Sequence, residues 1–436
     1  MNKSQSYPEL LVIGGGFAGI ALIKALRNAP YNITLIDKHN YHTFQPLLYQ
    51  VASGGLGADA IGYPFRLIFR NQKNFNFRMA EVLRIVPEAK CVETSVGDFK
   101  YDYLVIASGS TTNFFGMKEV EKWSMPMKTI PEALDLRSDI LQEFEYAHYT
   151  NDPVERARHM TFLVVGGGPT GVETAGALAE FQKFVLPHDY PELDKDLMKV
   201  YLVEAGPRLL AGMSEKSSAK AKQYLEQFGV KVLLNTAVTN YDGQEATLNN
   251  SKTIPTSTVI WAAGVKGQII YGIPKESLVG NRIKVDAFNH VEGFDDIFAL
   301  GDVAAMISED TPRGHPMVAP VAVQQAKHLA KNLKRLSKSK NILPFLYKDN
   351  GSMATVGRNK AVVDLPWTSF GGFFAWLVWM FLHLMLLVGF RNRVVTFIDW
   401  TWNYFSYERA LRLIVRTFDA EEVARARTAT AKSNIL

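Results

Sequence analysis

Two glycine-rich turns constrain the fold of this chain more than any other feature, because both have the spacing G-x-G-x-x-G. The spaced glycines are Gly14, Gly16 and Gly19 in the first turn, and Gly166, Gly168 and Gly171 in the second. Each turn follows a short apolar run and precedes a helical pattern. In such a unit the first glycine permits a tight turn, the second lets the backbone approach a pyrophosphate, and the third lets helix and strand pack closely. The pattern predicts an α/β chain with two Rossmann-like dinucleotide-binding domains.

An acidic residue ends the strand that follows each predicted helix. Asp37 ends ITLID and Glu204 ends KVYLVE, where a carboxylate can accept hydrogen bonds from ribose hydroxyls. Glu204 would repel the 2′-phosphate of NADPH, so its fold favours NADH, whereas Asp37 suits the ADP ribose of FAD equally well. The second unit also carries an insertion, FVLPHDYPELDKDL, which we interpret as a solvated excursion because it lacks the glycine of a calcium-binding loop.

The composition excludes several classes of protein. A chain of 436 residues is expected to hold two or three domains. Its single cysteine, Cys91, cannot form an internal disulfide, a redox pair or a cysteine metal cage, which argues against disulfide reductases and sulfide:quinone oxidoreductases. The net charge of +5 is mild, and no block of Lys and Arg marks a nucleic-acid site. We therefore expect no metal and no nucleic-acid partner. The N-terminus lacks a signal-peptide core, so the bulk of the protein is expected to stay in the cytosol.

The region 370–390 is the most apolar part of the chain, with His383 as its one ionisable side chain. At 1.5 Å per residue it would extend about 31 Å as a helix, the thickness of a hydrocarbon core. Five of the seven tryptophans lie near it, at positions 367, 376, 379, 400 and 402, which is typical of a membrane interface. Spanning would place the C-terminal arginines opposite the nucleotide domains, against the positive-inside tendency. We therefore expect a monotopic element, sunk in one leaflet.

The stretch that follows, 394–416, mixes apolar and aromatic residues with Arg409, Arg412 and Arg416. This pattern is typical of a helix that lies in the plane of the lipid headgroups. A dimer interface or a core interface would account for it as well.

Several stretches outside the glycine turns resemble known flavoprotein sequences. YDYLVIASGS (101–110), STVIWAAGV (257–265) and DIFALGDVA (296–304) resemble segments of two-dinucleotide flavoprotein reductases. NYHTFQPLLYQVASGGL (40–56) and the C-terminal FFAWLVWMFLHLMLLVGFRNR resemble segments of the type II NADH:quinone oxidoreductases, the single-subunit, non-pumping respiratory dehydrogenases. This resemblance implies non-covalent FAD, NADH as donor and a membrane quinone (menaquinone or ubiquinone) as acceptor. It also implies a homodimer at the cytoplasmic face of the inner membrane, bound to the lipid surface.

The resemblance assigns FAD to the first fold and NADH to the second. The residues expected at FAD are Gly14, Gly16, Gly19, Asp37, Lys38, Gln45, Val82, Ala107, Gly109, Asp302 and Gln324. The residues expected at NAD are Gly166, Gly168, Gly171, Glu173, Glu204, Ala263 and Gly264. Asp302 corresponds to the family aspartate that meets the ribityl and phosphate portion of FAD.

The expected quinone pocket departs from the family pattern at one position. The family usually carries two glutamines in an AQxAxQ pattern, whereas this chain has VAPVAVQQA (318–326), so Gln324 keeps the second position and Pro320 replaces the first. Proline is tolerated in the first turn of a helix, but it has no side-chain donor. Either Gln324 and Gln325 suffice, or the quinone head is held differently. The quinone-site candidates are Pro320, Gln324, Gln325, Arg358 and Lys360.

Three residues are expected to take part in the reaction: Glu173, Gln324 and Lys360. Glu173 lies two positions after Gly171, and the resemblance marks this position as important at the nicotinamide. Alternatively, the Glu173 carboxylate only interacts with the partial positive charge at the N-terminus of its helix. Arg358 and Lys360 are candidates for stabilising the reduced-flavin anion or orienting the quinone, and surface cations near lipid headgroups are the alternative.

The expected architecture has three parts. An FAD-binding domain comprises 1–115 and 280–345, an NAD(H)-binding domain comprises 116–279, and a C-terminal membrane-associating domain comprises 346–436. The expected activity is two-electron transfer from NADH through FAD to a membrane quinone. Two other functions stay open: an FAD- and NAD-binding protein whose redox state controls membrane association, and a reductase for a soluble ferredoxin-like partner.

Overall fold

The computed structural model describes residues 7–406, 411–414 and 419, and the chain divides into two compact units. The first unit comprises residues 1–43, 63–111 and 265–350, and the second comprises residues 44–62, 112–264 and 351–436. In this division the chain returns to the first unit at Val265, and the described residues from Gly351 onward are grouped with the second nucleotide fold. The predicted boundaries of the three domains stay a prediction.

The first unit is built on a parallel sheet of five strands in the order β22-β9-β1-β2-β5. Its helices and strands are β1 (Glu9–Ile13), α1 (Phe17–Ala25), β2 (Asn32–Asp37), β3 (Tyr41–Thr43), β4 (Gly62–Pro64), α4 (Phe65–Ile68), β5 (Phe75–Met79), β6 (Val82–Val86), β7 (Cys91–Thr94), β8 (Gly97–Lys100), β9 (Tyr103–Ile106), β10 (Ser110–Thr112), β19 (Val265–Gly267), β20 (Leu278–Val279), β21 (Arg282–Val285), β22 (Ile297–Ala299), β23 (Ala304–Met306) and α11 (Ala319–Leu336). The strands β4 and β10 contain points where the chain crosses between units.

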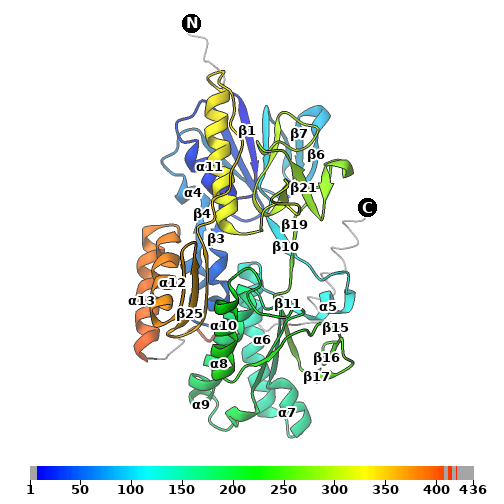
Figure 1. Ribbon diagram of the computed structural model, residues 1–436, viewed down its shortest axis with the longest axis vertical. Coiled ribbons are helices and arrows are strands. Elements are labelled where there is room, and N and C mark those ends of the chain that lie inside the picture. The colour runs from blue at the N-terminus through cyan, green and yellow to red at the C-terminus, as the bar shows by residue number, and fades with distance from the viewer. Residues whose placement is uncertain (1–6, 407–410, 415–418, 420–436) are drawn as a thin grey trace. The chain divides into compact units, whose positions relative to one another are not determined.

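Strand β1 is apolar throughout its buried length because both faces of this sheet are covered. Leu10 and Val12 belong to the core shared with α1 and α11, while Leu11 and Ile13 belong to a second core on the other face. Figure 1 shows α11 alongside this sheet. The alternation holds β1 in one register, with Ile13 opposite Ile36 of β2 and Ile106 of β9. The glycine turn that follows β1 therefore starts from a fixed position.

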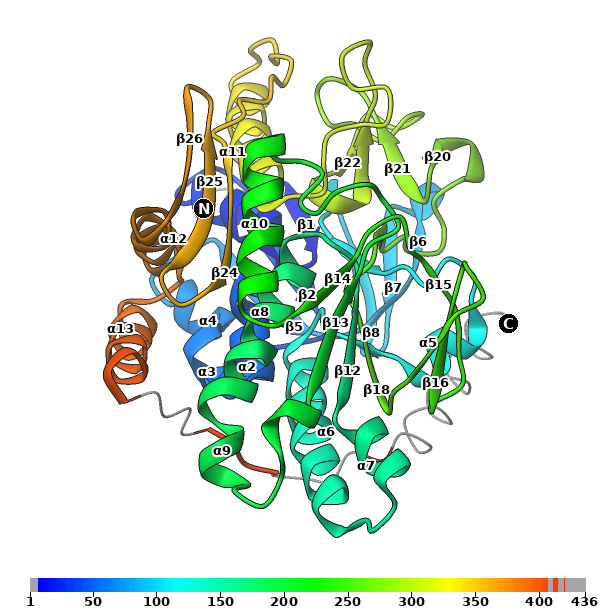
Figure 2. The same ribbon diagram turned by 60° about the horizontal axis from the view of Figure 1, so that its bottom comes forward.

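The second unit repeats the plan with a parallel sheet in the order β11-β18-β12-β13-β14. Figure 2 shows α8 and α10 beside it. Its helices and strands are α2 (Leu48–Ala52), α3 (Ala58–Ile61), α5 (Lys118–Trp123), β11 (Met125–Pro126), α6 (Ile130–Tyr149), α7 (Pro153–His159), β12 (Thr161–Val165), α8 (Pro169–Phe184), α9 (Leu186–Asp189), β13 (Lys199–Val203), α10 (Glu215–Gln227), β14 (Lys231–Leu233), β15 (Val238–Tyr241), β16 (Glu245–Leu248), β17 (Thr253–Pro255), β18 (Thr258–Trp261), β24 (Ser352–Gly357), β25 (Lys360–Leu365), β26 (Thr368–Gly372), α12 (Phe373–Leu386) and α13 (Phe390–Ser406).

The insertion after α8 is not a free excursion into solvent. Tyr190 donates a hydrogen bond to Glu145 at 2.8 Å, and its ring contacts Phe144 of α6. Asp189 forms a two-pronged ion pair with Arg412, at 2.6 and 3.0 Å. The insertion thus packs on α6 and binds Arg412, while its acids Glu192, Asp194 and Asp196 are exposed, as expected of a solvated segment.

The apolar run 370–390 divides among three elements rather than forming one helix. Phe370, Gly371 and Gly372 pair with β25 as part of β26, and the positive φ of Gly372 (+93°) turns the chain into α12. A second positive φ, at Gly389 (+90°), separates α12 from α13. With 14 residues, α12 is about 21 Å long. Among the described residues, no helix combines the length and the apolar character needed to span a membrane.

The five tryptophans near this run differ in environment. Trp379 and Trp400 are 2% and 8% exposed, whereas Trp367 and Trp402 are 79% and 61% exposed. The interface interpretation is therefore wrong for the two buried tryptophans, which pack against each other inside the unit. Arg409 and Arg416 lie outside the described residues.

Candidate active site

The first glycine turn leaves a cradle at the start of α1. A Cβ atom on Gly14, whose φ is +97°, would lie 2.3 Å from the carbonyl oxygen of Ala107, and one on Gly19 would lie 2.0 Å from the carbonyl oxygen of Gly14. A Cβ atom on Gly16 would meet no atom within 4 Å. Two glycines are thus required by packing, and Gly16 keeps open the space at the helix N-terminus where a diphosphate would bind.

The second turn repeats this geometry at the start of α8. A Cβ atom on Gly171 would lie 1.8 Å from the carbonyl oxygen of Gly166, while one on Gly168 would meet nothing within 4 Å. Gly166, with a φ of +111°, packs against the backbone of Ala262 as Gly14 does against Ala107. The sequence prediction named Ala263 and Gly264 and missed Ala262, although the matching segments ASG (107–109) and AAG (262–264) could have indicated it.

The two strand-end acids also occupy matching positions. Asp37 accepts backbone hydrogen bonds from Gly15 at 2.7 Å and from His39 at 2.8 Å. Glu204 accepts from the backbone of Gly167 at 2.5 Å and of Gly206 at 2.6 Å. Burial raises the pKa of Asp37, and these two backbone N–H groups oppose the rise. Each carboxylate braces its glycine turn and, because a carboxylate can accept about four hydrogen bonds, has capacity left for ribose hydroxyls.

A buried histidine that sequence reasoning missed supports the first turn. The Nδ1 atom of His42 lies 3.0 Å from the carbonyl oxygen of Gly15, and its ring meets Phe17 edge-on. Burial lowers the pKa of His42 to about 4, so the ring is neutral at physiological pH. His42 lies in the stretch NYHTF, which the family resemblance had already assigned to the flavin side, so this stretch could have indicated it.

Asp302 lies in the first unit on a turn held by α11. Its carboxylate accepts a hydrogen bond from the Ser110 hydroxyl at 2.5 Å, and the neighbouring Gly301 donates its N–H to Gln325 at 2.8 Å. Gln324 instead pairs its side-chain amide with both backbone groups of Lys348, at 2.9 and 3.0 Å. Pro320 lies in the first turn of α11, as expected. Both glutamines therefore have structural partners, and their roles at FAD and the quinone stay predictions.

The other predicted cofactor residues divide between the units. Lys38, Val82, Ala107 and Gly109 lie in the first unit, and Gln45 lies in the second. Ala107 is held by a backbone hydrogen bond to Ile13 at 2.8 Å, next to the turn. Their contacts with FAD stay predictions.

Glu173 lies on the first turns of α8 and is 7% exposed. The backbone N–H of Thr355, in β24, donates to its Oε1 atom at 3.3 Å. Burial raises the pKa of the Glu173 carboxyl to about 8, although Thr355 and the neighbouring indole of Trp379 oppose the rise. The carboxyl is therefore mainly protonated at pH 7, as a proton donor should be.

A cavity of about 120 Å³ adjoins this carboxyl, entirely within the second unit. Its walls come from α2, α8, β24, α12 and α13, and its lining is both aromatic and polar. The lining includes Tyr49, Gln50, Ser53, Ala177, Glu180, Arg358, Trp376, Trp379, Trp400, Asn403 and Tyr404. Sequence reasoning named Arg358 and Glu173 and missed the others, since they come from segments far apart in the chain.

The two predicted cations have different surroundings. The guanidinium of Arg358 donates to the carbonyl oxygens of Tyr404 and Asn403, at 2.9 and 2.6 Å, and so satisfies acceptors at the C-terminus of α13. Lys360 points to α10, where its ammonium donates to Gln227 at 2.6 Å and lies 4.6 Å from the ring centre of Phe228. Arg358 and Lys360 belong to the second unit, whereas Pro320, Gln324 and Gln325 belong to the first. The quinone site formed by these residues stays a prediction.

Comparison with known proteins places this geometry in a family. The model of the pyridine nucleotide-disulphide oxidoreductase family matches residues 8–326, and that of the NDH2 C-terminal domain matches residues 350–406. The type II NADH:quinone oxidoreductase Ndh of Mycobacterium tuberculosis is 34% identical, over 96% of this chain and 92% of its own length. The chain belongs to the type II NADH:quinone oxidoreductase family. A second relative from the same organism, the type II NADH:quinone oxidoreductase NdhA, is 37% identical over 90% of this chain and 86% of its own length.

Solved structures confirm the fold expected for this family. NDH2 from Plasmodium falciparum in complex with NADH superimposes with a TM-score of 0.85 at 23% identity, covering 94% of this chain and all of that one. The sulfide:quinone oxidoreductase of Aquifex aeolicus gives a TM-score of 0.70 at 21% identity, over 92% and 96% of the two chains. The predicted α/β fold with two dinucleotide-binding domains and a C-terminal helical segment is confirmed, and FAD and NADH as cofactors follow from family membership.

Proposed function

We propose that this type II NADH:quinone oxidoreductase is a membrane-associated respiratory enzyme that oxidises NADH through FAD and reduces a membrane quinone by two electrons, without pumping protons. The observation that carries the proposal is the pair of matching nucleotide turns in one chain, with the buried Glu173, whose pKa is raised by burial, two positions after the last glycine of the second turn. Two dinucleotides bound by one chain suit hydride transfer from one to the other, because binding both converts the reaction into an intramolecular one.

Each nucleotide fold has its own task. Bound FAD supplies the two-electron chemistry between NADH and quinone. The first turn holds its diphosphate at Gly16, Asp37 binds its ribose, and Asp302 binds its ribityl portion. The second turn holds the NADH diphosphate at Gly168, and Glu204 accepts from the adenosine ribose and disfavours NADPH.

Glu173 supplies a proton to the quinone. NADH and quinone give NAD⁺ and quinol only if one further proton enters from the medium, because NADH carries two electrons and one proton. A carboxyl with a pKa of about 8 is well matched to donate it near neutral pH. Gln324 and Lys360 remain the other predicted participants, with Pro320, Gln325 and Arg358 as further contacts of the quinone.

Reduction of a short-chain quinone by the purified protein tests this function. Rapid NADH oxidation in its presence, at tens of turnovers per second, supports the proposal because typical enzymes work at that rate. A yellow protein that NADH reduces but quinone reoxidises slowly would instead support the redox-responsive membrane protein. Rapid reoxidation by a ferredoxin-like protein but not by quinone would support the soluble-partner reductase.

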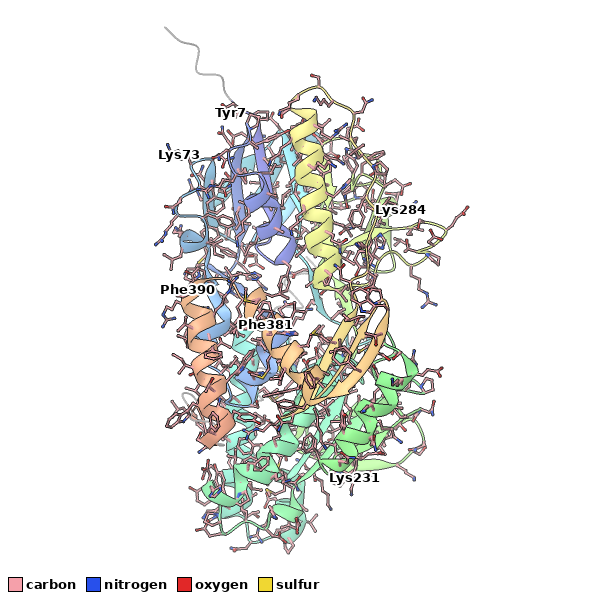
Figure 3. All side chains as sticks on the ribbon, turned by 60° about the vertical axis from the view of Figure 1, so that its left-hand side comes forward. Tyr7, Lys73, Lys231, Lys284, Phe381 and Phe390 are labelled. Carbon is pink, nitrogen blue, oxygen red and sulfur yellow. The ribbon has the colours of Figure 1, made fainter. Side chains whose placement is uncertain are left out.

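The exposed faces of α12 and α13 form the membrane-binding surface in this proposal. Large apolar side chains that are at least half exposed gather there, including Phe374, Phe381, Phe390, Phe397, Ile398, Trp402 and Phe405. Figure 3 labels Phe381 and Phe390 on the two helices. So many exposed aromatic rings on adjacent helices are typical of a surface that is covered in use, and quinone is itself dissolved in lipid. We place the enzyme at the cytoplasmic face of the inner membrane as a homodimer that uses menaquinone or ubiquinone.

Replacing Phe381 and Phe405 together by Ser should release the protein from lipid vesicles. These side chains are 67% and 78% exposed, so the fold should survive, while the loss of two inserted rings should weaken binding by tenfold or more, since each buried aromatic contributes about 1.5 to 3 kcal/mol. Cosedimentation with phosphatidylcholine–phosphatidylglycerol vesicles measures this. Tyr149→Ser removes a ring that is 73% exposed on α6 and should leave binding unchanged. Equal binding by all three proteins would contradict the assignment of this surface.

A further inference from the structure

One stripe of α8 forms a continuous wall of the cavity beside Glu173. The lining residues of this helix are Glu173, Ala177, Glu180 and Phe184. Their spacing of four, three and four residues places them on one face. The two carboxyl groups are seven residues apart, about 10 Å along the helix axis, and the small Ala177 lies between them.

The cavity changes from buried to half-exposed along this stripe. At the Glu173 end the walls are fully buried: Ala177, Thr355 and Trp379 are at most 4% exposed. At the other end Glu180 is half-buried, and the walls are the similarly half-buried Arg358 and Tyr404. The stripe therefore leads from the buried carboxyl toward solvent.

The walls offer polar groups to water along this path. The Trp379 indole Nε1 faces Glu173, yet among the described residues it has no hydrogen bond of ordinary length and angle. Gln50 and Glu180 add amide and carboxylate groups. A polar cavity needs only about 10 to 15 Å³ of space accessible to water to hold one water molecule, so a space of about 120 Å³ is large enough for several.

We propose that this cavity is a hydrated proton-entry route, in which water between Glu173 and Glu180 carries the proton consumed in each turnover from solvent to Glu173. This inference rests on the proposed function and adds the route and Glu180 as its outer carboxylate. In the step at Glu173, the carboxyl O–H bond breaks as an O–H bond of the quinol forms, and cavity water returns a proton to the carboxylate. The electron pair comes from NADH, so no further reactant is required.

Filling the cavity at its centre tests the route. Ala177→Leu adds three carbon atoms between the two carboxyl groups, and Glu180→Gln removes the outer carboxylate while keeping an acceptor for the backbone N–H of Arg358, which donates to Glu180 at 2.5 Å. Stopped-flow absorbance follows the bound flavin in three reactions: reduction by NADH, reoxidation by ferricyanide and reoxidation by a saturating short-chain quinone. Ferricyanide accepts electrons without protons.

We expect NADH to reduce both variants, and ferricyanide to reoxidise them, at wild-type rates. Quinone should reoxidise them at about one tenth of the wild-type rate or at a still lower rate, because an efficient proton donor is lost. A small weak acid such as formic acid should restore the rate of Glu180→Gln. Two controls outside the cavity should match the wild type: Ala157→Leu, on α7, and Glu226→Gln, on α10. If Ala177→Leu fails to fold, Ala177→Val and Glu180→Gln give the same comparison.

Three results would overturn the route. Wild-type quinone rates in both variants, with a slowed Glu173→Gln, would reject it and leave the proposed function standing. Wild-type rates in all three, Glu173→Gln included, would reject the role of Glu173 as well. A raised KM for quinone with an unchanged rate at saturation would show that the cavity holds quinone instead of water.

Discussion

Gly171→Ala is expected to abolish NADH oxidation and to destabilise the second unit. The added Cβ atom would lie 1.8 Å from the carbonyl oxygen of Gly166, so α8 must move away from the turn. Overpacking of this kind typically costs about 1 to 3 kcal/mol, and the displaced helix N-terminus loses its place under the diphosphate. We expect a fall in activity of at least about 100-fold, because misplacement by 1 Å alone can cost that much. Steady-state kinetics and chemical unfolding measure the two effects.

Gly168→Ala provides the matched control that separates an effect on folding from an effect on NADH binding. Its Cβ atom would meet no protein atom within 4 Å, so the free energy of unfolding should stay within about 0.5 kcal/mol of the wild type, while the NADH Kd rises. In the first unit, Gly19→Ala and Gly16→Ala form the same pair for FAD, which absorbance of the purified protein reports. If Gly168→Ala bound NADH as the wild type does, the turn would not be the diphosphate site.

The glycine turns could be predicted from the sequence because their geometry is local. A strand, a turn and a helix within about twelve residues fix Gly14, Gly16 and Gly19 relative to one another, and Asp37 returns to the turn because β2 pairs with β1. The same glycine spacing recurs from Gly166 onward, so each of the two turns supported the prediction of the other.

The C-terminal region could not be predicted in the same way, because hydropathy does not report which backbone groups are already paired. Phe370 lies in a strand opposite Val363, and the break at Gly389 depends on one backbone angle. Trp379 and Trp400 were assigned to the membrane interface because the sequence alone does not distinguish a tryptophan in a protein core from a tryptophan at a lipid surface. The hydrogen bond from Trp400 Nε1 to Gln50, at 2.7 Å, joins residues 350 positions apart, beyond any local pattern. The same holds for the ion pair of Asp189 with Arg412.

Glu173→Gln is expected to remove a pH dependence from both the stability and the chemistry of the protein. The folded-state pKa of Glu173 is about 8, above its ordinary value of 4.5, because burial disfavours the charged form. Between these values the folded protein keeps a proton that the unfolded chain releases, so this carboxyl makes the wild type less stable as the pH rises through that window. Glutamine carries no such proton. The variant should match the wild type at pH 4.5 and exceed its free energy of unfolding by about 4 kcal/mol at pH 9.

Denaturant unfolding at the two pH values measures this difference, and Glu226→Gln provides the control. Glu226 is exposed and pairs with Lys222 at 3.4 Å, so its replacement should show no comparable change with pH. In stopped-flow experiments, reoxidation by quinone should be about 100-fold slower in Glu173→Gln, and the wild-type rate should fall above pH 8 as the donor loses its proton. A variant with the same stability difference at both pH values would show that Glu173 is charged in the folded protein. It would then lack the proton at neutral pH that the proposed reaction needs.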